Sequence, residues 1–310
     1  MSDKVVVLTG GIGGAKLVLG LTRVMPPADI TAIVNTGDDF THLGLRVSPD
    51  IDTLSYTLSG QDDAERGWGR RGESWNFMAA LTALGGEDWF NLGDGDLALH
   101  VLRTQALARG ETLSAVTARV AAQWGISAAI LPMTDAPVAT MLDTNNGVLP
   151  FQRYFVEHRC APVVTGIRFE GALSAPVAPG VVEAIHNAFL VLIAPSNPYL
   201  SVDPILSVPA IAQALRDTAA PVVAVSPLIG GQSVKGPTAK LMHELGVPVD
   251  TASIIAHYGA LLDAILLDTG DAAEAGAFPH AVTDTLMRTP DDRDRVARAA
   301  LALGRATRRR

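Results

Sequence analysis

The fold is decided near the N-terminus, where residues 4–16 read KVVVLTGGIGGAK. The run Lys4–Thr9 is rich in β-branched residues and shows no alternation of apolar and polar side chains, which is typical of a strand buried on both faces. Glycines follow at once, and Ala15–Met25 places Leu17, Leu21 and Val24 on one helical stripe before Pro26 stops the helix. A second apolar run, Ile30–Val34, predicts another buried strand. This order of strand, helix and strand predicts a βαβ unit.

The later chain repeats this pattern in three short apolar runs, Val163–Ile167, Phe189–Ala194 and Val222–Val225, each followed by polar residues and a candidate helix. The alternation predicts an α/β fold with a Rossmann-like, doubly wound and mainly parallel sheet. We expect a single α/β domain over residues 1–310, with a helical insert at about 70–125 where the apolar spacing becomes helical. Asn146-Gly147, between the strand-like runs 138–143 and 148–156, predicts a hairpin with a type I′ turn.

The composition is that of a globular protein, because 48% of the 310 residues are hydrophobic and 18% are charged, which excludes intrinsic disorder. The formal net charge of −8 argues against nucleic acid as a partner, although a local group of N–H donors can still bind a small anion. Cys160 is the only cysteine, which excludes an intramolecular disulfide and is consistent with a reducing compartment. No apolar run approaches the ~18 residues of a spanning helix. We therefore expect a cytoplasmic protein without a membrane segment.

The glycine-rich stretch between the first strand and the first helix is a candidate anion site. Gly11, Gly13 and Gly14 let the backbone approach a phosphate at a helix N-terminus, and Lys16 adds a positive charge. The stretch lacks the ending of a Walker A loop and the clean spacing of a dinucleotide fingerprint. The alternative is a tight turn whose glycines serve only close packing.

Two acidic segments come after the second strand. Asp38 and Asp39 follow it directly, and Asp50 and Asp52 lie a short distance further along the chain. Clustered carboxylates repel one another unless a cation joins them, so the segments predict magnesium, which prefers oxygen ligands. The alternative is that these aspartates cap helices or form Asx turns.

Polar loops follow two later strands. Ser196 and Asn197 come after the run 189–194, and Lys235 lies in a glycine-rich stretch after 222–225. These side chains are candidate nucleotide or phosphate contacts, with Lys235 as a point charge, and a solvated surface lysine is the alternative. The sequence contains neither a zinc-type histidine spacing nor the Gly-x-Ser-x-Gly elbow of a serine hydrolase.

Taken in order, these stretches resemble the 2-phospho-L-lactate transferase family, which acts in the biosynthesis of the deazaflavin coenzyme F-420. The resemblance covers nearly the entire chain. The stretches that carry it are 10–16, 34–39, 48–53, 67–69, 92–94, 131–135, 194–198, 226–231, 235–237 and 283–287.

The resemblance implies a transferase that moves a phosphorylated three-carbon acid from a guanosine diphosphate-linked donor to the deazaflavin alcohol Fo and releases GMP. The acid is of the 2-phospholactyl, phosphoenolpyruvyl or 3-phosphoglyceryl type, and the sequence leaves this choice open. Asp52 and Asn91 fall where the family contacts Fo, and Asn91 stands where many relatives have lysine. Relatives also suggest a homodimer. The alternative is a nucleotide-sugar-binding regulator of the same superfamily, resembling the gluconeogenesis-factor proteins.

Transfer between anionic groups requires charge neutralisation and alignment. We therefore expect Asp39 and Asp52 to bind magnesium and Asp50 to accept the proton of the attacking hydroxyl, which makes these three the candidate catalytic residues. Trp68, flanked by glycines, is the candidate to stack on the flat deazaflavin, whereas Trp75 lies on an apolar helical stripe and is expected to pack.

Overall fold

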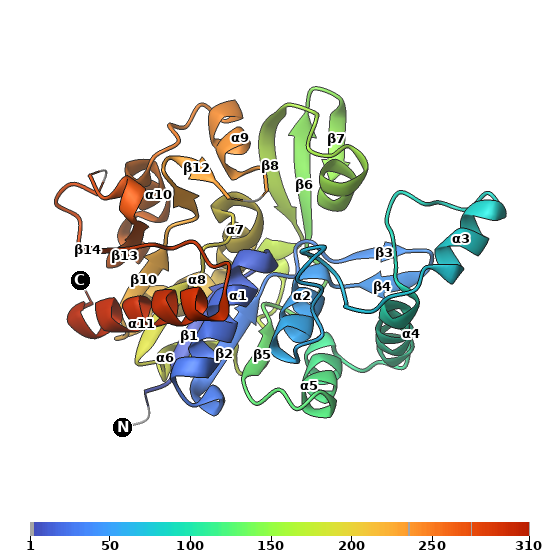
Figure 1. The fold of residues 1–310 in the computed structure, drawn as a ribbon, viewed down its shortest axis with the longest axis horizontal. Coiled ribbons are helices and arrows are strands. Elements are labelled where there is room, and N and C mark those ends of the chain that lie inside the picture. Colours follow the sequence, from blue (N-terminus) through green and yellow to red (C-terminus); the bar gives the residue numbers. More distant parts are fainter. Residues whose placement is uncertain (1–2, 235, 274, 310) are drawn as a thin grey trace.

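The computed structural model describes residues 3–234, 236–273 and 275–309, and its centre is a parallel β-sheet. Seven strands lie in the order β14-β13-β10-β9-β1-β2-β5, and every neighbouring pair is parallel (Figure 1). The predicted α/β fold with a Rossmann-like, mainly parallel sheet is therefore confirmed. The strands are β1 (Val5–Thr9), β2 (Ile30–Val34), β5 (Ala129–Pro132), β9 (Leu190–Ile193), β10 (Val222–Val225), β13 (Ala264–Asp268) and β14 (His280–Thr283).

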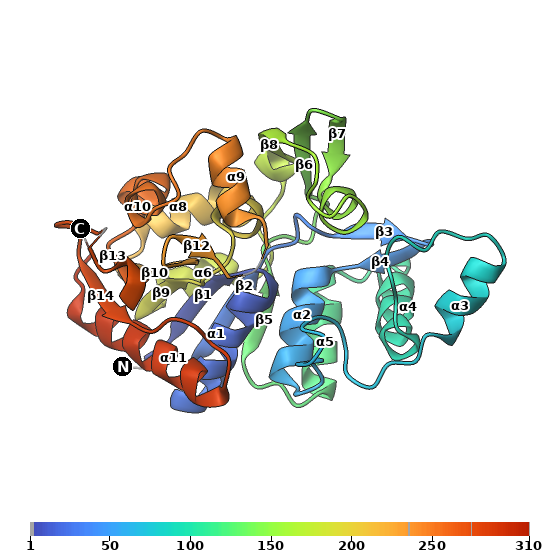
Figure 2. The same ribbon diagram turned by 45° about the horizontal axis from the view of Figure 1, so that its top comes forward.

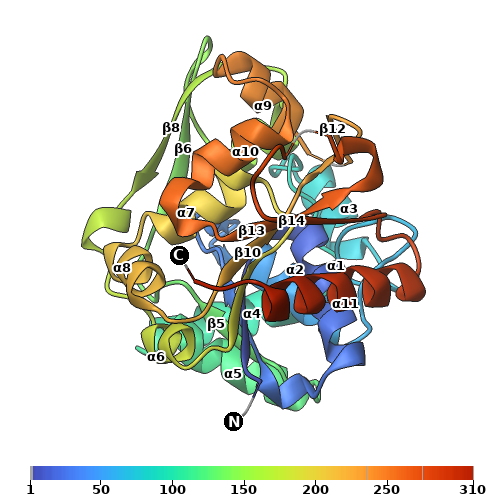
Figure 3. The ribbon, with the colours of Figure 1, turned by 90° about the vertical axis from the view of Figure 1, so that its left-hand side faces the viewer.

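Helices flank both faces of this sheet, with α1 and α11 on one face and α6 and α8 on the other (Figure 3). This double cover is why the strands read as continuous apolar runs. The flanking helices are α1 (Gly11–Val24), α6 (Val181–His186), α7 (Asp203–Leu206), α8 (Pro209–Asp217), α9 (Thr238–Glu244), α10 (Thr251–Tyr258) and α11 (Pro290–Ala306).

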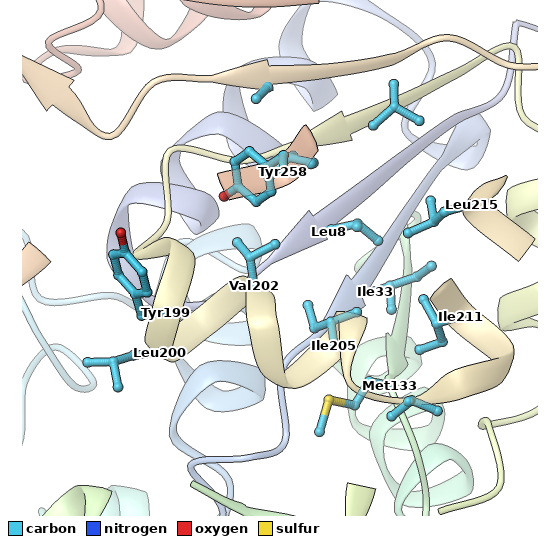
Figure 4. Packing of buried hydrophobic residues seen from close by; sticks show 14 of the residues in the cluster. Leu8, Ile33, Met133, Tyr199, Leu200, Val202, Ile205, Ile211, Leu215 and Tyr258 are labelled. Carbon is cyan, nitrogen blue, oxygen red and sulfur yellow. The ribbon is translucent and has the colours of Figure 1, made fainter. Parts of the chain in front are cut away.

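Alternate side chains of β1 enter two separate hydrophobic layers. Val5 and Val7 pack with α1 and α11, whereas Val6 and Leu8 pack with the helices on the opposite face. Figure 4 shows Leu8 in the second layer, which also contains Ile205 of α7. Each face of the strand is thus buried by a different set of helices, and the carboxyl ends of the strands remain open for a site.

Between β2 and β5 the chain leaves the sheet and forms mostly helices. Helices α3, α4 and α5 fall within the predicted helical insert, and α3 and α4 lie away from the sheet together with the antiparallel pair β3-β4 (Figure 2). Val101 and Leu102 are exposed on α4. The elements of this segment are β3 (Phe40–His42), β4 (Leu45–Val47), α2 (Pro49–Leu58), α3 (Asn76–Ala83), α4 (Asp94–Ala108) and α5 (Leu113–Gln123).

A second sheet has three antiparallel strands in the order β7-β6-β8. Strands β6 (Ala139–Thr144) and β7 (Gly147–Pro150) form the predicted hairpin. The predicted type I′ turn is wrong, because neither Asn145 nor Asn146 has a positive φ, and only Gly147 does, at 96°. A left-handed glycine after the turn closes this hairpin instead.

Strand β8 (Val164–Glu170) overlaps the run predicted as a parallel strand at Val163–Ile167. That prediction is wrong in direction, because β8 pairs antiparallel with β6 and belongs to the smaller sheet. An apolar run indicates that a strand is buried, but it does not indicate the strand with which that strand pairs. The predicted second hairpin strand, 148–156, is also too long, because the chain becomes helical after Pro150.

The C-terminal helix α11 is capped by Thr289, whose side chain accepts a hydrogen bond from the Asp292 N–H. In the described ranges, no helix combines the length and the apolar character needed to cross a membrane. A short pair, β11 (Leu228–Ile229) and β12 (Gln232–Ser233), lies between β10 and α9.

Candidate functional site

A cavity of about 770 Å³ lies at the carboxyl ends of the central strands. Ligands of doubly wound proteins bind at this edge of the sheet. Segments that are far apart in the sequence converge on it. The cavity is lined by residues from the stretches 10–16, 38, 47–56, 66–69, 90–100, 151–156, 195–201, 226–234, 236–238 and 285–287.

Most of the residues predicted from the sequence lie around this one cavity. Gly14 and Asp39 do not line it, and Lys235 lies outside the described residues. The predicted residues that line it are Gly11, Gly13, Lys16, Asp50, Asp52, Trp68, Asn91, Ser196 and Asn197.

The glycine-rich stretch is not a free loop, because α1 begins at Gly11. Gly11 has a φ of 65° and open space where a Cβ would stand, so its backbone conformation requires glycine. A Cβ on Gly13 would lie 2.7 Å from the Pro195 carbonyl oxygen, and a Cβ on Gly14 would collide with Thr9 Oγ1. Gly13 and Gly14 therefore serve close packing, and the first turn of α1 is held against the cavity wall.

The carboxylate of Asp50 binds the N-terminal end of α1. Its Oδ1 accepts a hydrogen bond from the Gly11 N–H at 2.6 Å, and its Oδ2 accepts one from Asn35 Nδ2 at 3.0 Å. Asn35 is fully buried and also donates to the Leu200 carbonyl at 3.3 Å. The first N–H of α1 is thus bound by an anion of the chain itself, at the positive end of the helix dipole.

Asp38 and Asp50 are two buried carboxylates that oppose each other's ionisation. Burial raises the pKa of Asp38 well above its usual range, and repulsion from Asp50 raises it further. Burial also raises the pKa of Asp50 to about 6, although hydrogen bonds from Asn35 and Gly11 act against this. Asp38 Oδ1 is buried without a hydrogen-bond partner in the described chain.

These two carboxylates fit a divalent cation that takes its remaining ligands from water and from phosphate oxygens. Within the described residues, no three or more His, Cys, Asp and Glu side chains form a metal-binding group. The chain alone therefore offers Asp38 and Asp50 but not a complete cage, as is usual for magnesium bound together with a phosphorylated substrate.

Asp39 lines a neighbouring cavity of about 490 Å³ but not the larger one, whereas Asp38 borders both. Asp39 Oδ2 accepts a hydrogen bond from Ser48 Oγ at 2.6 Å. Burial raises the pKa of Asp39 to about 8, and the Ser48 hydrogen bond and Arg103 act against this rise. Asp39 and Asp52 thus line different cavities, and their joint binding of magnesium stays a prediction.

We expect Asp39→Asn to stabilise the protein at pH 8. Native Asp39 keeps its proton up to a pH of about 8, whereas an unfolded aspartate loses it near pH ~4. The native state therefore binds more protons over this interval, and its free energy of unfolding falls as the pH rises. Urea denaturation should show a gain of several kcal/mol for the variant at pH 8, up to ~5 kcal/mol for a pKa raised by about four, and a much smaller difference at pH ~4.5. An equal difference at both pH values would contradict the assignment.

Asp52 lies on the first turn of α2 and is paired with a buried arginine. Arg103 Nη1 donates to Asp52 Oδ2 at 3.1 Å, and Arg103 Nη2 donates to the other carboxylate oxygen. Although burial lowers the pKa of the Arg103 guanidinium, the attraction of Asp52 raises it overall. Both oxygens of Asp52 are thus already bound by a cation of the chain.

Four polar residues of this region were not found by sequence reasoning: Tyr56, Asp96, His100 and Arg103. The signal was present on α4, where Asp96, His100 and Arg103 follow the spacing of one helical face. His100 Nε2 lies 3.1 Å from Asp96 Oδ2, and Tyr56 donates to Asp96 Oδ1. Burial acts to raise the pKa of Asp96, but its contacts with His100 and Tyr56 lower it below the usual value.

Ser196 and Asn197 hold the backbone around the cavity. Ser196 Oγ donates to the Gly10 carbonyl at 2.7 Å, and Asn197 Oδ1 accepts from the N–H groups of Tyr199 and Leu200. In the chain as described, the Asn197 Nδ2 is buried without a hydrogen-bond partner. Asn197 is therefore the better candidate of the two for contact with an anionic ligand.

The second glycine pair, Gly230-Gly231, resembles an anion loop in sequence but already binds a carboxylate. The N–H groups of Gly230 and Gly231 donate to Asp271 at 3.0 and 2.7 Å. Lys16 donates to the Met287 carbonyl at 2.9 Å, which joins α1 to the 285–287 segment. These contacts hold two of the segments that line the cavity, 226–234 and 285–287.

Trp68 and Asn91 face the cavity from the segment between α2 and α4. Trp68 is half exposed and contacts Trp75 edge to face, with 6.2 Å between ring centroids. The Arg66 guanidinium lies 5.1 Å from the Trp68 ring centroid and 4.8 Å from that of Trp75. Trp75 does not line the cavity and packs against its neighbours, as predicted.

Comparison with known proteins agrees with the family resemblance of the sequence over nearly the whole chain. The family model described as 2-phospho-L-lactate transferase CofD matches residues 5–301. A phosphoenolpyruvate transferase of Streptomyces coelicolor is 42% identical, over 98% of this chain and 99% of the relative, and one of Mycolicibacterium smegmatis is 38% identical, over 97% and 98%. A crystal structure of a Bacillus halodurans protein of the UPF0052 family shares the fold, with a TM-score of 0.63, 19% identity and coverage of 96% of this chain and 99% of that chain. The chain belongs to the 2-phospho-L-lactate transferase (CofD) family, a transferase family of coenzyme F-420 biosynthesis.

Proposed function

We propose that this chain transfers a phosphoenolpyruvyl group from a guanosine diphosphate-linked donor to the terminal hydroxyl of Fo and releases GMP. The choice of acid is supported by the relatives, which are named phosphoenolpyruvate transferases and align over nearly the full chain. The observation that carries the proposal is the convergence of the α1 N-terminus, Asn197 and Asp52 on one cavity. A cavity of about 770 Å³ is large enough for a nucleotide and a ring system together.

The donor would bind on the side of α1. The first turn of this helix lines the cavity with Ile12 and Gly13, and a helix N-terminus attracts phosphate through its unpaired N–H groups. Asn197 would donate to the diphosphate through Nδ2, and Lys16 would contribute its charge. Lys235, in the glycine-rich stretch after β12, stays a predicted phosphate contact.

The acceptor would bind on the opposite side, between α2 and the segment that carries Trp68 and Asn91. The half-exposed indole of Trp68 offers a flat apolar surface for the deazaflavin ring, and Asn91 offers hydrogen bonds at its edge. Asp52 would accept a hydrogen bond from the ribityl chain. This places the terminal hydroxyl of Fo between Asp52 and the donor phosphates.

The reaction exchanges one phosphorus–oxygen bond for another. The Fo hydroxyl oxygen attacks the phosphorus that carries the three-carbon acid, the bond from this phosphorus to the oxygen shared with GMP breaks, and GMP leaves. Asp52 would orient the hydroxyl and take its proton as the new bond forms, as an aspartate does in protein kinases, and it would replace Asp50 in the role predicted from the sequence. Magnesium, held by Asp38 and Asp50, would supply charge neutralisation at the diphosphate. The other residues of the cavity would align the hydroxyl with the phosphorus and exclude water.

The direct test is an assay of the purified chain with Fo, magnesium and a freshly generated guanylylated donor. We expect GMP and a more acidic deazaflavin product, with the highest kcat/KM for the phosphoenolpyruvate donor over the phospholactate and phosphoglycerate donors. A preference for either other acid would overturn the choice of donor. Absence of GMP with all three, together with tight binding of a nucleotide sugar, would support the regulator instead.

We also propose that the chain forms a homodimer, as the family resemblance implies. Apolar side chains on the helices remote from the sheet support this, since Phe77, Leu84, Val101 and Leu102 are exposed. Light scattering should then report twice the 32.4 kDa chain mass.

A further inference from the structure

The guanidinium of Arg103 lies directly behind the carboxylate that faces the acceptor side of the cavity. We propose that Arg103 is the positioning residue for Asp52 and thereby determines how the chain binds and orients the deazaflavin alcohol. The inference rests on the proposed function and names a residue that acts through Asp52 rather than on substrate.

Arg103 and Asp52 form a buried, bidentate ion pair. Arg103 is 2% exposed and Asp52 is 5% exposed. Each Nη of Arg103 donates to a different oxygen of Asp52, and Nη1 also donates to the Arg46 carbonyl at 3.3 Å. A planar fork bound to both oxygens sets the plane of the carboxylate as well as its position.

Arg103 is one layer removed from the cavity. Asp52 lines the cavity and Arg103 does not. His100, one turn earlier on α4, lies 3.4 Å from Arg103 Nη1 through its Nδ1 and 3.8 Å from Asp52 Oδ2. The guanidinium is therefore held on the side of Asp52 that faces α4, and the free lone pairs of Asp52 are left to the cavity.

The network joins α4 to α2 at two points, which lie one helical turn apart on α2 and about two turns apart on α4. Asp52 pairs with Arg103, and Tyr56, one turn further along α2, donates to Asp96 at the start of α4. Two fixed points prevent rotation of one helix about the other. Loss of Arg103 should therefore disturb the orientation of Asp52 and leave the donor side of the cavity, at α1 and Asn197, unchanged.

The test compares Arg103→Met, Arg103→Lys and Asp52→Asn, and the double variant Asp52→Asn/Arg103→Met, in the full chain. Equilibrium binding of Fo and of GDP is measured for each variant, together with kcat and the KM values for Fo and donor. We expect Arg103→Met to weaken Fo binding by about tenfold or more and to leave GDP binding within about twofold, since only the acceptor side changes. Arg103→Lys should recover part of the loss, because an ammonium keeps the charge but not the fork.

The double variant separates positioning from a general loss of structure. If Arg103 acts through Asp52, Arg103→Met should change Fo binding by less than about twofold in the Asp52→Asn background. This double variant also removes the unpaired buried charge, so it should fold even where Arg103→Met alone does not. Arg309→Met is the matched control, because Arg309 pairs with buried Asp263 at 2.6 Å outside the cavity. It should lower stability without changing Fo binding.

Three results would overturn the inference: unchanged Fo binding in Arg103→Met, a parallel loss of GDP binding, or the same loss of Fo binding with and without the Asp52 carboxylate. Wild-type Fo binding and GMP release report on the proposed function separately. A wild-type chain that binds no Fo would overturn both, whereas an active wild type with an unaffected Arg103→Met overturns only the role of Arg103.

Discussion

Gly13→Ala is expected to lower the free energy of unfolding by about 2 kcal/mol, since overpacking of a closed site costs ~1–3 kcal/mol. The added Cβ would lie 2.7 Å from the Pro195 carbonyl oxygen, which is backbone and cannot rotate away. Helix propensity alone predicts the opposite sign, because alanine is favoured over glycine within a helix by ~1 kcal/mol. The steric effect should dominate, and α1 should move away from the loop that follows β9. Urea denaturation measures the loss, and the same displacement should reduce transferase activity.

Gly11→Ala is the matched control for this prediction, because it adds the same methyl group two residues earlier. No atom lies within 4 Å of that Cβ, but the φ of 65° is unfavourable for alanine. We expect a cost of about 1 kcal/mol from backbone strain alone. If Gly13→Ala is no more destabilising than Gly11→Ala, the close packing of α1 on Pro195 does not explain the glycine.

Asp50→Asn is expected to lower kcat/KM by about 10²–10³-fold, which corresponds to ~3–4 kcal/mol of transition-state stabilisation. Asp50 belongs to α2, and it accepts a hydrogen bond from the first N–H of α1. It lies beside Asp38, where the diphosphate and its magnesium are proposed to bind. Removal of one of two carboxylates should also raise the magnesium concentration needed for half-maximal rate by about tenfold or more. A magnesium titration of the transferase rate measures both effects.

The pH dependence of the wild type provides an independent check. Because the pKa of Asp50 is raised to about 6, protons compete with magnesium for this carboxylate as the pH falls through that value. The magnesium requirement should increase below pH ~6 in the wild type, and this increase should be smaller in Asp50→Asn, where Asp38 is the remaining proposed carboxylate ligand. Asp217→Asn is the control, since Asp217 lies on the exposed end of α8 and bonds only Gln213 in the contacts described. An unchanged magnesium response in Asp50→Asn would remove Asp50 from the metal site.

The candidate site was predictable from the sequence in its location but not in its internal contacts. Glycines after β1, acids after β2 and polar residues after β9 predict a shared cavity, because parallel strands end at one edge of the sheet. Which carboxylate takes which partner was not predictable. Asp52 meets Arg103 from a helix 51 residues further along the chain, and Asp39 enters a neighbouring cavity.

The sequence by itself determined the βαβ order, the parallel central sheet and the family. A strand that is buried on both faces is recognisable from its own residues, because they form a β-branched run with no alternation of apolar and polar side chains. The family is recognisable because the order of the short motifs can be read directly along the chain. Only the tertiary structure decided the direction of β8, the packing role of Gly13 and the pairing of Asp52 with Arg103. Each of these depends on atoms contributed by distant segments, and the distances between such atoms are set when helices and strands pack, not by neighbours in the chain.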